Sequence, residues 1–342
     1  MVISGSSPIF VSTVFAHYTH HIFNLILFLL TWIAMTAVLI STDLFNDYYD
    51  HILKADDLNP ISTPFSGGSR VIQEGLIPEK TILYVSVAGL VFAAIIGLYL
   101  NFILDKITIL LLGLVGFFLV YFYTAPPIKL CYRGLGEIAQ AIGYGPVMFY
   151  GAYFVQTQTI TTDIVLFSIP FTFIGLIVGM ILSIPDYDAD KNARKNNLVI
   201  ILGQRKTILL YSCILLLIFI SDAILLIVKI IPLWSLIVFI TIPLAIVSVI
   251  NGLKNFNNPS LFLRTSKLTL VIAALHNYLF IIGLIISIFP IMGGILAIKR
   301  KMWGISVAFS IIGLLSIGIL FTSSIFSFIA IIILFISKKE FQ

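Results

Sequence analysis

The chain has 342 residues, of which 60% are hydrophobic and only 10% are charged, and its formal net charge is +5. A soluble domain carries about 25% charged residues, so this chain cannot cover itself with polar surface and lipid must be its solvent. The two cysteines, Cys131 and Cys213, are too few for a disulfide framework. No nucleotide-binding loop or zinc-binding pattern is present, and we expect no nucleic-acid partner.

The chain divides into long apolar runs, and a membrane-spanning helix needs about 20 such residues. Runs without Asp, Glu, Lys or Arg are Ile22–Thr42, Thr81–Leu104, Ile107–Ile128, Ile138–Thr162, Ile164–Pro185, Ile230–Leu253, Leu268–Ile298 and Met302–Ser337. Val2–Ala16 is a shorter first span, and Asp222 interrupts a further run over Thr207–Val228. We expect Asp222 to lie near the outer end of its span, in view of nearby Lys229. Because lipid-facing backbone must satisfy its own hydrogen bonds, these runs predict helices.

The predicted fold is therefore all-α, a polytopic transmembrane bundle. About nine helices form a core over residues 1–289, and residues 290–342 add one or two C-terminal helices of unknown role. Lys299, Arg300 and Lys301 fall on the side of the membrane poor in basic residues if Leu268–Ile298 crosses once. Either that stretch crosses more than once, near Pro290, or the local charge rule is violated.

The basic residues distinguish the two sides of the membrane. The polar segments after the second, fourth, sixth and eighth spans hold 13 of the 20 basic residues, whereas the alternate loops up to the ninth span hold only Lys106 and Lys229. Loops rich in Lys and Arg face the cytoplasm. The sequence thus predicts a multi-pass protein of the cell membrane whose long polar loops are cytoplasmic.

Two acidic clusters occupy these cytoplasmic loops. Asp47 and Asp50 follow the second span at spacing i,i+3, and Asp186 and Asp190 follow the sixth at spacing i,i+4. On a helix each pair shares one face, and four intervening spans place both pairs on the same side. Facing carboxylates repel one another unless a cation joins them, and Mg²⁺ prefers carboxylate and phosphate oxygens. The alternative is that these acids are ordinary solvated loop residues or helix caps.

Cationic and glycine residues accompany the acids. Arg70, Lys191 and Lys195 could contact the oxygens of a diphosphate, although each alone is equally explained as a cytoplasmic loop charge. Gly67-Gly68 could form a turn that exposes backbone N–H groups to an anion.

The arrangement resembles the UbiA superfamily of intramembrane prenyltransferases. The matching residues are Asn46-Asp47-x-x-Asp50 and Asp186-x-x-x-Asp190, within a likeness that covers roughly Ser7 to Ile286. Further stretches are similar to the branch that prenylates 1,4-dihydroxy-2-naphthoate for menaquinone. They include Asp56, Pro64-Phe65-Ser66-Gly67-Gly68-Ser69-Arg70, Tyr123-Thr124-Ala125-Pro126-Pro127 and Gly134-Leu135-Gly136-Glu137. One departure is Arg194-Lys195-Asn196-Asn197, where the family often has a Gly-Lys-Arg-Thr-like run.

The resemblance implies an enzyme that transfers a polyprenyl group from its diphosphate to a small aromatic acceptor. It implies Mg²⁺ held by Asp47, Asp50, Asp186 and Asp190, which are then the catalytic and metal-binding residues. The substrate-binding residues implied with them are Asn46, Asp56, Arg70, Tyr123, Lys191 and Lys195. The partners are the polyprenyl diphosphate, the acceptor and the bilayer; the oligomeric state stays open.

Two alternatives stay open. In the first, the same prenyl-transfer chemistry uses another acceptor, either a glyceryl phosphate lipid precursor or a different quinone ring. A cation-coupled transporter is more remote, because it needs charged residues near span centres and the acidic pairs here lie at span ends.

Overall fold

The structure, a computed structural model, describes residues 5–55, 68–104 and 107–298. Within these ranges the chain is a bundle of helices without a named strand, so the all-α prediction is confirmed. Asp56 lies outside the described residues, and of the expected C-terminal segment 290–342 only residues 290–298 are described.

Seven helical stretches among the described residues are long and apolar enough to cross a membrane. They are α3 (Leu25–Ile52), α4 (Glu79–Leu104), α5 (Ile107–Thr124), α8 with α9 (Thr162–Phe167 and Ile169–Ser183), α12 (Gln204–Ile227), η3 with α13 (Leu233–Thr241 and Ile242–Asn255), and α14 (Pro259–Ile298). The remaining elements are α2 (Ser7–His20), η1 (Leu130–Tyr132), α6 (Gly136–Ile142), η2 (Gly143–Val147), α7 (Met148–Thr157), α10 (Tyr187–Asn192) and α11 (Leu198–Leu202).

The predicted span Ile138–Thr162 is a broken helix rather than a regular one. Its halves α6 and α7 are joined by the π-helical stretch η2, which contains Pro146. Proline lacks an N–H and cannot complete the ladder of a regular helix, which accounts for a local change of winding at this point. The break matters because residues of α6 and η2 line the cavity described below.

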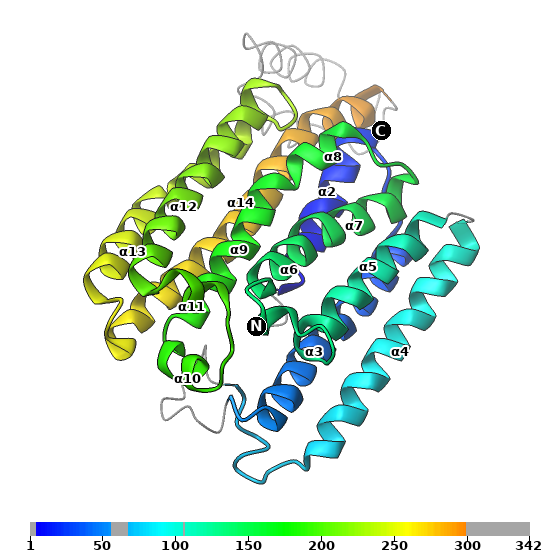
Figure 1. The fold of residues 1–342 in the computed structure, drawn as a ribbon. Coiled ribbons are helices and arrows are strands. Elements are labelled where there is room, and N and C mark those ends of the chain that lie inside the picture. The colour runs from blue at the N-terminus through cyan, green and yellow to red at the C-terminus, as the bar shows by residue number, and fades with distance from the viewer. Residues whose placement is uncertain (1–4, 56–67, 105–106, 299–342) are drawn as a thin grey trace.

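The centre of the bundle is α9, which packs against α6, η2, α12 and α14 (Figure 1). Within its span 61% of the residues are buried, against 6% in the α5 span. The α4 and α5 helices instead carry many exposed aliphatic and aromatic side chains. Such a surface suits hydrocarbon rather than water, so α4 and α5 form a lipid-facing flank and α9 the protein-facing core.

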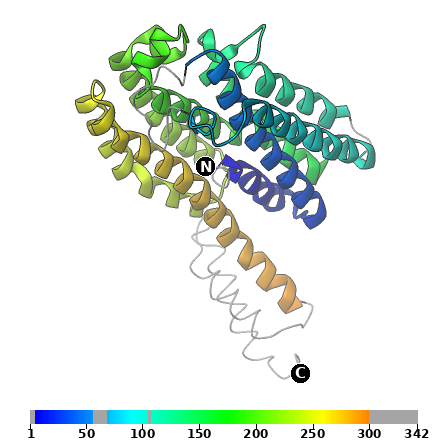
Figure 2. The ribbon, with the colours of Figure 1, turned by 90° about the horizontal axis from the view of Figure 1, so that it is seen from below.

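Two helices are longer than their apolar runs. The α3 helix continues ten residues past Thr42, the end of its apolar run, so both Asp47 and Asp50 lie on the helix itself, as their helical spacing predicts. The α14 helix is a single element of 40 residues, about 60 Å long at 1.5 Å per residue. Pro290 therefore does not divide Leu268–Ile298 into separate crossings, and Figure 2 shows the last turns of α14 projecting beyond the other helices.

Asp222 lies in the last turns of α12, which ends at Ile227, so its position near one end of the span agrees with the expectation. Its side chain is nevertheless fully buried, and His276 Nε2 lies 2.9 Å from its Oδ2. The pair joins α12 to α14, and His276 also packs against the rings of Phe171 and Phe280. A buried carboxylate is costly unless it is paired, and here the partner comes from a helix distant in sequence.

Small residues bring α9 against the broken span. A Cβ built on Gly175 would lie 2.9 Å from Tyr144 Cβ and 3.0 Å from Ala141 Cα. Both distances are too short for real side chains, and Ala141 Cα belongs to the backbone and cannot turn aside. The contact therefore requires glycine, as is common where membrane helices approach closely.

Replacing Gly175 by alanine should force α9 away from α6. We expect Gly175→Ala to lower the free energy of unfolding by about 1–3 kcal/mol, measured by thermal unfolding in detergent. Gly113→Ala is the matched control, because a Cβ at Gly113 meets nothing within 4 Å and alanine favours a helix. Equal stability of the two variants would contradict the close packing described here.

Candidate active site

A cavity of about 630 Å³ opens among α3, α5, α6, α9, α10 and α14. Its polar end is lined by Asp47, Asp50, Asp186, Asp190 and Lys195. Elsewhere its walls are largely apolar, with Met35, Val38, Leu39, Leu119, Val120, Val147, Met148, Leu182 and Leu270 among the lining residues. The cavity thus joins a charged end to an apolar interior, which suits a ligand with an anionic head and a hydrocarbon body.

The first acidic cluster lies on one face of α3. Asp43, Asn46, Asp47 and Asp50 all line the cavity, and their spacing of three or four residues brings them to the same side of the helix. Asp50 is almost completely buried. Asp47 Oδ1 accepts a hydrogen bond of 3.3 Å from the backbone N–H of Ser69, which follows Gly68 in the left-handed conformation. The turn after Gly68 thus presents a backbone N–H to an anion, as predicted, but the anion is the Asp47 carboxylate of the protein itself.

The second cluster is formed by the short helix α10. Asp186 is the residue before its first turn, and Asp190 is buried one turn later. Asn197 Nδ2 donates a hydrogen bond of 2.6 Å to Asp190 Oδ2. Burial, together with the charges of Asp186 and Asp50, outweighs the opposing effect of Lys195 and raises the pKa of Asp190 to about 7. Burial is the main cause of the raised pKa, and the two neighbouring carboxylates add to it.

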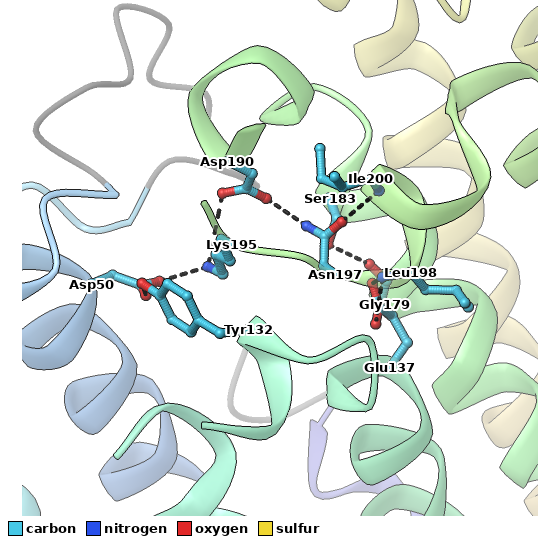
Figure 3. A network of polar contacts seen from close by, with 10 residues as sticks. All are labelled: Asp50, Tyr132, Glu137, Gly179, Ser183, Asp190, Lys195, Asn197, Leu198 and Ile200. Carbon is cyan, nitrogen blue, oxygen red and sulfur yellow. Dashed lines mark hydrogen bonds and ion pairs between the residues drawn. The ribbon is translucent and has the colours of Figure 1, made fainter. Parts of the chain in front are cut away.

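Lys195 brings the two clusters together (Figure 3). Its ammonium group lies 2.8 Å from Asp50 Oδ2 and 3.9 Å from Asp190 Oδ1. Burial would lower the pKa of Lys195, but the carboxylates of Asp50 and Asp190 outweigh it and raise the pKa well above its ordinary value. Lys195 is therefore held as a cation, and the clusters that are far apart in sequence meet at one end of the bundle.

Tyr132 and Glu137 support this network and were not singled out as site residues from the sequence. The Tyr132 hydroxyl donates a 2.8 Å hydrogen bond to Asp50 Oδ1, and the Tyr132 ring lies 5.7 Å from the Lys195 ammonium. Burial and the Asp50 charge raise the pKa of Tyr132. Glu137 accepts a 3.1 Å bond from the Leu198 N–H at the start of α11. A tyrosine next to a loop carries no periodic signal, so only the fold could reveal Tyr132.

The other predicted site residues fall into two groups. Asn46 and Tyr123 line the cavity. Arg70 is half-buried in the segment after Gly68, beside the Ser69 N–H that binds Asp47. Lys191 is exposed, with its ammonium 5.9 Å from the Tyr187 ring, and it does not line the cavity. Asp43, in contrast, lines the cavity although the sequence prediction did not select it; its position four residues before Asp47 was the available signal.

The residues present fit a magnesium ion that is completed by its substrate. Carboxylates from two elements surround one end of the cavity, and Asn46 Oδ1 is buried without a hydrogen-bond partner. These are the hard oxygen donors that Mg²⁺ prefers. In the described part of the chain no three His, Cys, Asp or Glu side chains lie close enough to hold a metal by themselves.

Fold and cavity together define an intramembrane protein with an acidic, metal-compatible head-group site above an apolar interior. The sequence model of the UbiA prenyltransferase family matches residues 6–270 of the chain. The chain therefore belongs to the UbiA prenyltransferase family and is a multi-pass membrane prenyltransferase. This membership confirms the resemblance inferred from the acidic motifs, and it gives the transporter alternative no support.

Individual relatives agree with this membership. The chain is 28% identical over 282 residues to a 1,4-dihydroxy-2-naphthoate octaprenyltransferase of Bacillus subtilis, covering 82% of this chain and 88% of that protein. Its fold is similar to a digeranylgeranylglyceryl phosphate synthase, with TM-score 0.57, 20% identity and coverage of 83% and 94%. It is also similar to a UbiA homologue of Archaeoglobus fulgidus bound to DMAPP and Mg²⁺, with TM-score 0.50, 14% identity and coverage of 81% and 97%.

The hydrogen bond from Tyr132 offers a direct test of the network. We expect Tyr132→Phe to lower kcat/KM for the prenyl diphosphate about tenfold, because a bond to a buried carboxylate contributes about 1.5–3 kcal/mol. The measurement is steady-state transfer by the purified protein. Tyr84→Phe, at an exposed tyrosine on α4, should be neutral. Unchanged kinetics in Tyr132→Phe would remove Tyr132 from the site.

Proposed function

We propose that the protein transfers a polyprenyl group from polyprenyl diphosphate to 1,4-dihydroxy-2-naphthoate, as in menaquinone biosynthesis. The observation that carries this proposal is the meeting of the two acidic clusters around Lys195 at one end of an apolar cavity. The naphthoate acceptor is supported by the name of the Bacillus subtilis relative.

The acidic end of the cavity would hold the diphosphate. Asp47, Asp50, Asp186 and Asp190 would bind Mg²⁺, with the Asn46 carbonyl as an auxiliary ligand. Bound Mg²⁺ supplies positive charge that offsets the charge on the departing diphosphate. Lys195 adds a fixed cation between the clusters, and Arg70, beside the first cluster, completes the basic surroundings of the head group. Lys191, on the short helix of the second cluster, and Asp56, which lies outside the described residues, are the other proposed substrate-binding residues.

The apolar interior would receive the reacting end of the prenyl chain. Because few polar groups line it, water is largely excluded from the allylic cation that forms when the C–O bond breaks. The ring of Tyr123 lines the cavity, and an aromatic face stabilises a nearby cation. The acceptor ring then attacks the cation, and a naphthoate acceptor also loses its carboxyl group.

The acceptor is tested by incubating membranes that contain the protein with labelled prenyl diphosphate and a panel of acceptors. We expect transfer to 1,4-dihydroxy-2-naphthoate and not to glyceryl phosphate. Glyceryl phosphate belongs in the panel because the chain shares its fold with a digeranylgeranylglyceryl phosphate synthase. Transfer to glyceryl phosphate alone would overturn the naphthoate assignment while leaving the prenyl-transfer chemistry intact.

The same assay examines the metal site. Chelation of Mg²⁺, Asp47→Asn and Asp186→Asn should each abolish transfer while the protein still inserts into the membrane. Asp188→Asn is the matched control, because Asp188 is exposed between the two acids of the second cluster and does not line the cavity. Full activity in Asp186→Asn, or equal loss in Asp188→Asn, would count against the assigned ligands.

We further propose that the acidic end of the cavity faces the cytoplasm. The support is the excess of Lys and Arg in the segments at that end. In a Cys213→Ala background, Asn192→Cys should react with a membrane-impermeant maleimide only after the cells are permeabilised. Thr159→Cys, exposed after α7, should react in intact cells. The opposite labelling pattern would invert the proposed orientation.

A further inference from the structure

Besides the four proposed metal ligands and Glu137, a sixth acid, Asp43, lines the cavity. It lies on the same face of α3 as Asp47, four residues earlier and therefore about 6 Å further along the helix, away from the end that carries Asp50. The Asp43 side chain is exposed to the cavity rather than packed among other helices. A carboxylate within a membrane-spanning helix is costly and is usually kept for function.

The position of Asp43 along the cavity corresponds to where the reacting carbon atoms would lie, and not to where the diphosphate would lie. If the diphosphate occupies the end marked by Asp50 and Asp190, the first carbon of the prenyl chain lies one step further into the cavity. The attacking ring approaches that carbon, once it is part of the allylic cation, from a side that the departing diphosphate does not occupy. Asp43 is one helical turn inward from Asp47 and therefore lies at the depth where the ring must sit.

Few other polar groups are available at that depth. The Tyr144 hydroxyl lines the cavity but already contacts Asn277 Nδ2 at 2.6 Å. Thr42 donates its hydroxyl hydrogen to the Val38 carbonyl oxygen. Gln140 also lines the cavity, but an amide cannot take a proton from an acceptor. Glu137 lines the cavity too, but its carboxylate is bound to the Leu198 N–H beside the second cluster. Among the described residues outside the head-group clusters, Asp43 is thus the lining carboxylate best placed to act as a base.

We propose that Asp43 binds a ring hydroxyl of the acceptor and takes its proton during transfer; this rests on the aromatic acceptor of the proposed function. As the hydroxyl proton moves to the Asp43 carboxylate, the oxygen becomes a carbonyl. The electron pair that is released forms the bond from the carboxyl-bearing ring carbon to the first prenyl carbon. The bond from that carbon to the diphosphate breaks, and its electron pair leaves with the diphosphate.

The same carboxyl completes the reaction. The intermediate carries its carboxylate one carbon from the new carbonyl, an arrangement that loses CO₂ because the electron pair can return to the carbonyl oxygen. The aryloxide so formed recovers the proton from Asp43, and the ring is aromatic again. Asp43 ends as it began, and the products are the prenylated diol, CO₂ and diphosphate.

The test is Asp43→Asn in the full-length protein, which keeps the size of the side chain but cannot accept the proton. We expect kcat with the dihydroxynaphthoate to fall at least about a hundredfold, the usual contribution of a positioned base. The KM for prenyl diphosphate and the Mg²⁺ concentration for half-maximal rate should stay within about twofold, as should binding of the labelled diphosphate in dialysis. Asp163→Asn, at an exposed acid on α8, is the control.

A second acceptor separates a base from a structural role. This acceptor is the dihydroxynaphthoate in which the hydroxyl next to the carboxyl group is methylated, so it has no proton to give. The wild-type protein should prenylate the methyl ether more slowly than the free acceptor. The Asp43→Asn variant should prenylate both acceptors at the same low rate. Retained kcat in Asp43→Asn, or a matching shift in Mg²⁺ dependence, would overturn the role of Asp43 alone. Wild type that transfers to no aromatic acceptor would overturn the proposed function and with it this inference.

Discussion

The contact between Lys195 and the carboxylates of Asp50 and Asp190 is the interaction on which the site depends. Two groups of acids that face each other would repel, and a single fixed cation is what lets them stand at one end of a cavity. One lysine cannot balance the charge of the carboxylates gathered there, and burial, together with the charges of Asp186 and Asp50, raises the pKa of Asp190. The protein therefore holds its donor site in a state that attracts further positive charge.

The fold maintains this arrangement by packing rather than by charge. The α9 helix leads directly into the second cluster, and its Gly175 permits contact with the broken span that carries Glu137. Glu137 in turn binds the first turn of α11, whose capping residue Asn197 binds Asp190. Each step is a direct contact, so a displacement of α9 would reach the carboxylates.

The sequence predicted those parts of the structure that leave a regular pattern of apolar residues, or a difference in basic charge between alternate loops. The apolar runs predicted the spans, and the parity of the loops placed Asp47 and Asp186 at the same end. Tyr132 could not be found in this way, because its contact with Asp50 spans 82 residues and follows from loop geometry. The apolar run of α3 stops at Thr42, and only the helical spacing of Asp47 and Asp50 indicated that the helix continues through residues that face a cavity instead of lipid.

Asp43 and Asp222 illustrate how intramembrane acids divide into two kinds. Both interrupt apolar helices and both would be costly if left charged in hydrocarbon. Asp222 is fully buried and one of its oxygens pairs with His276 on another helix, so a ligand cannot reach it. Asp43 faces a cavity beside a head-group site, where a ligand can approach it. Composition cannot separate the two cases, since each is a single aspartate in an apolar run. Access to a cavity distinguishes them: Asp43 can contact a substrate, whereas Asp222 contributes to the packing of α12 against α14.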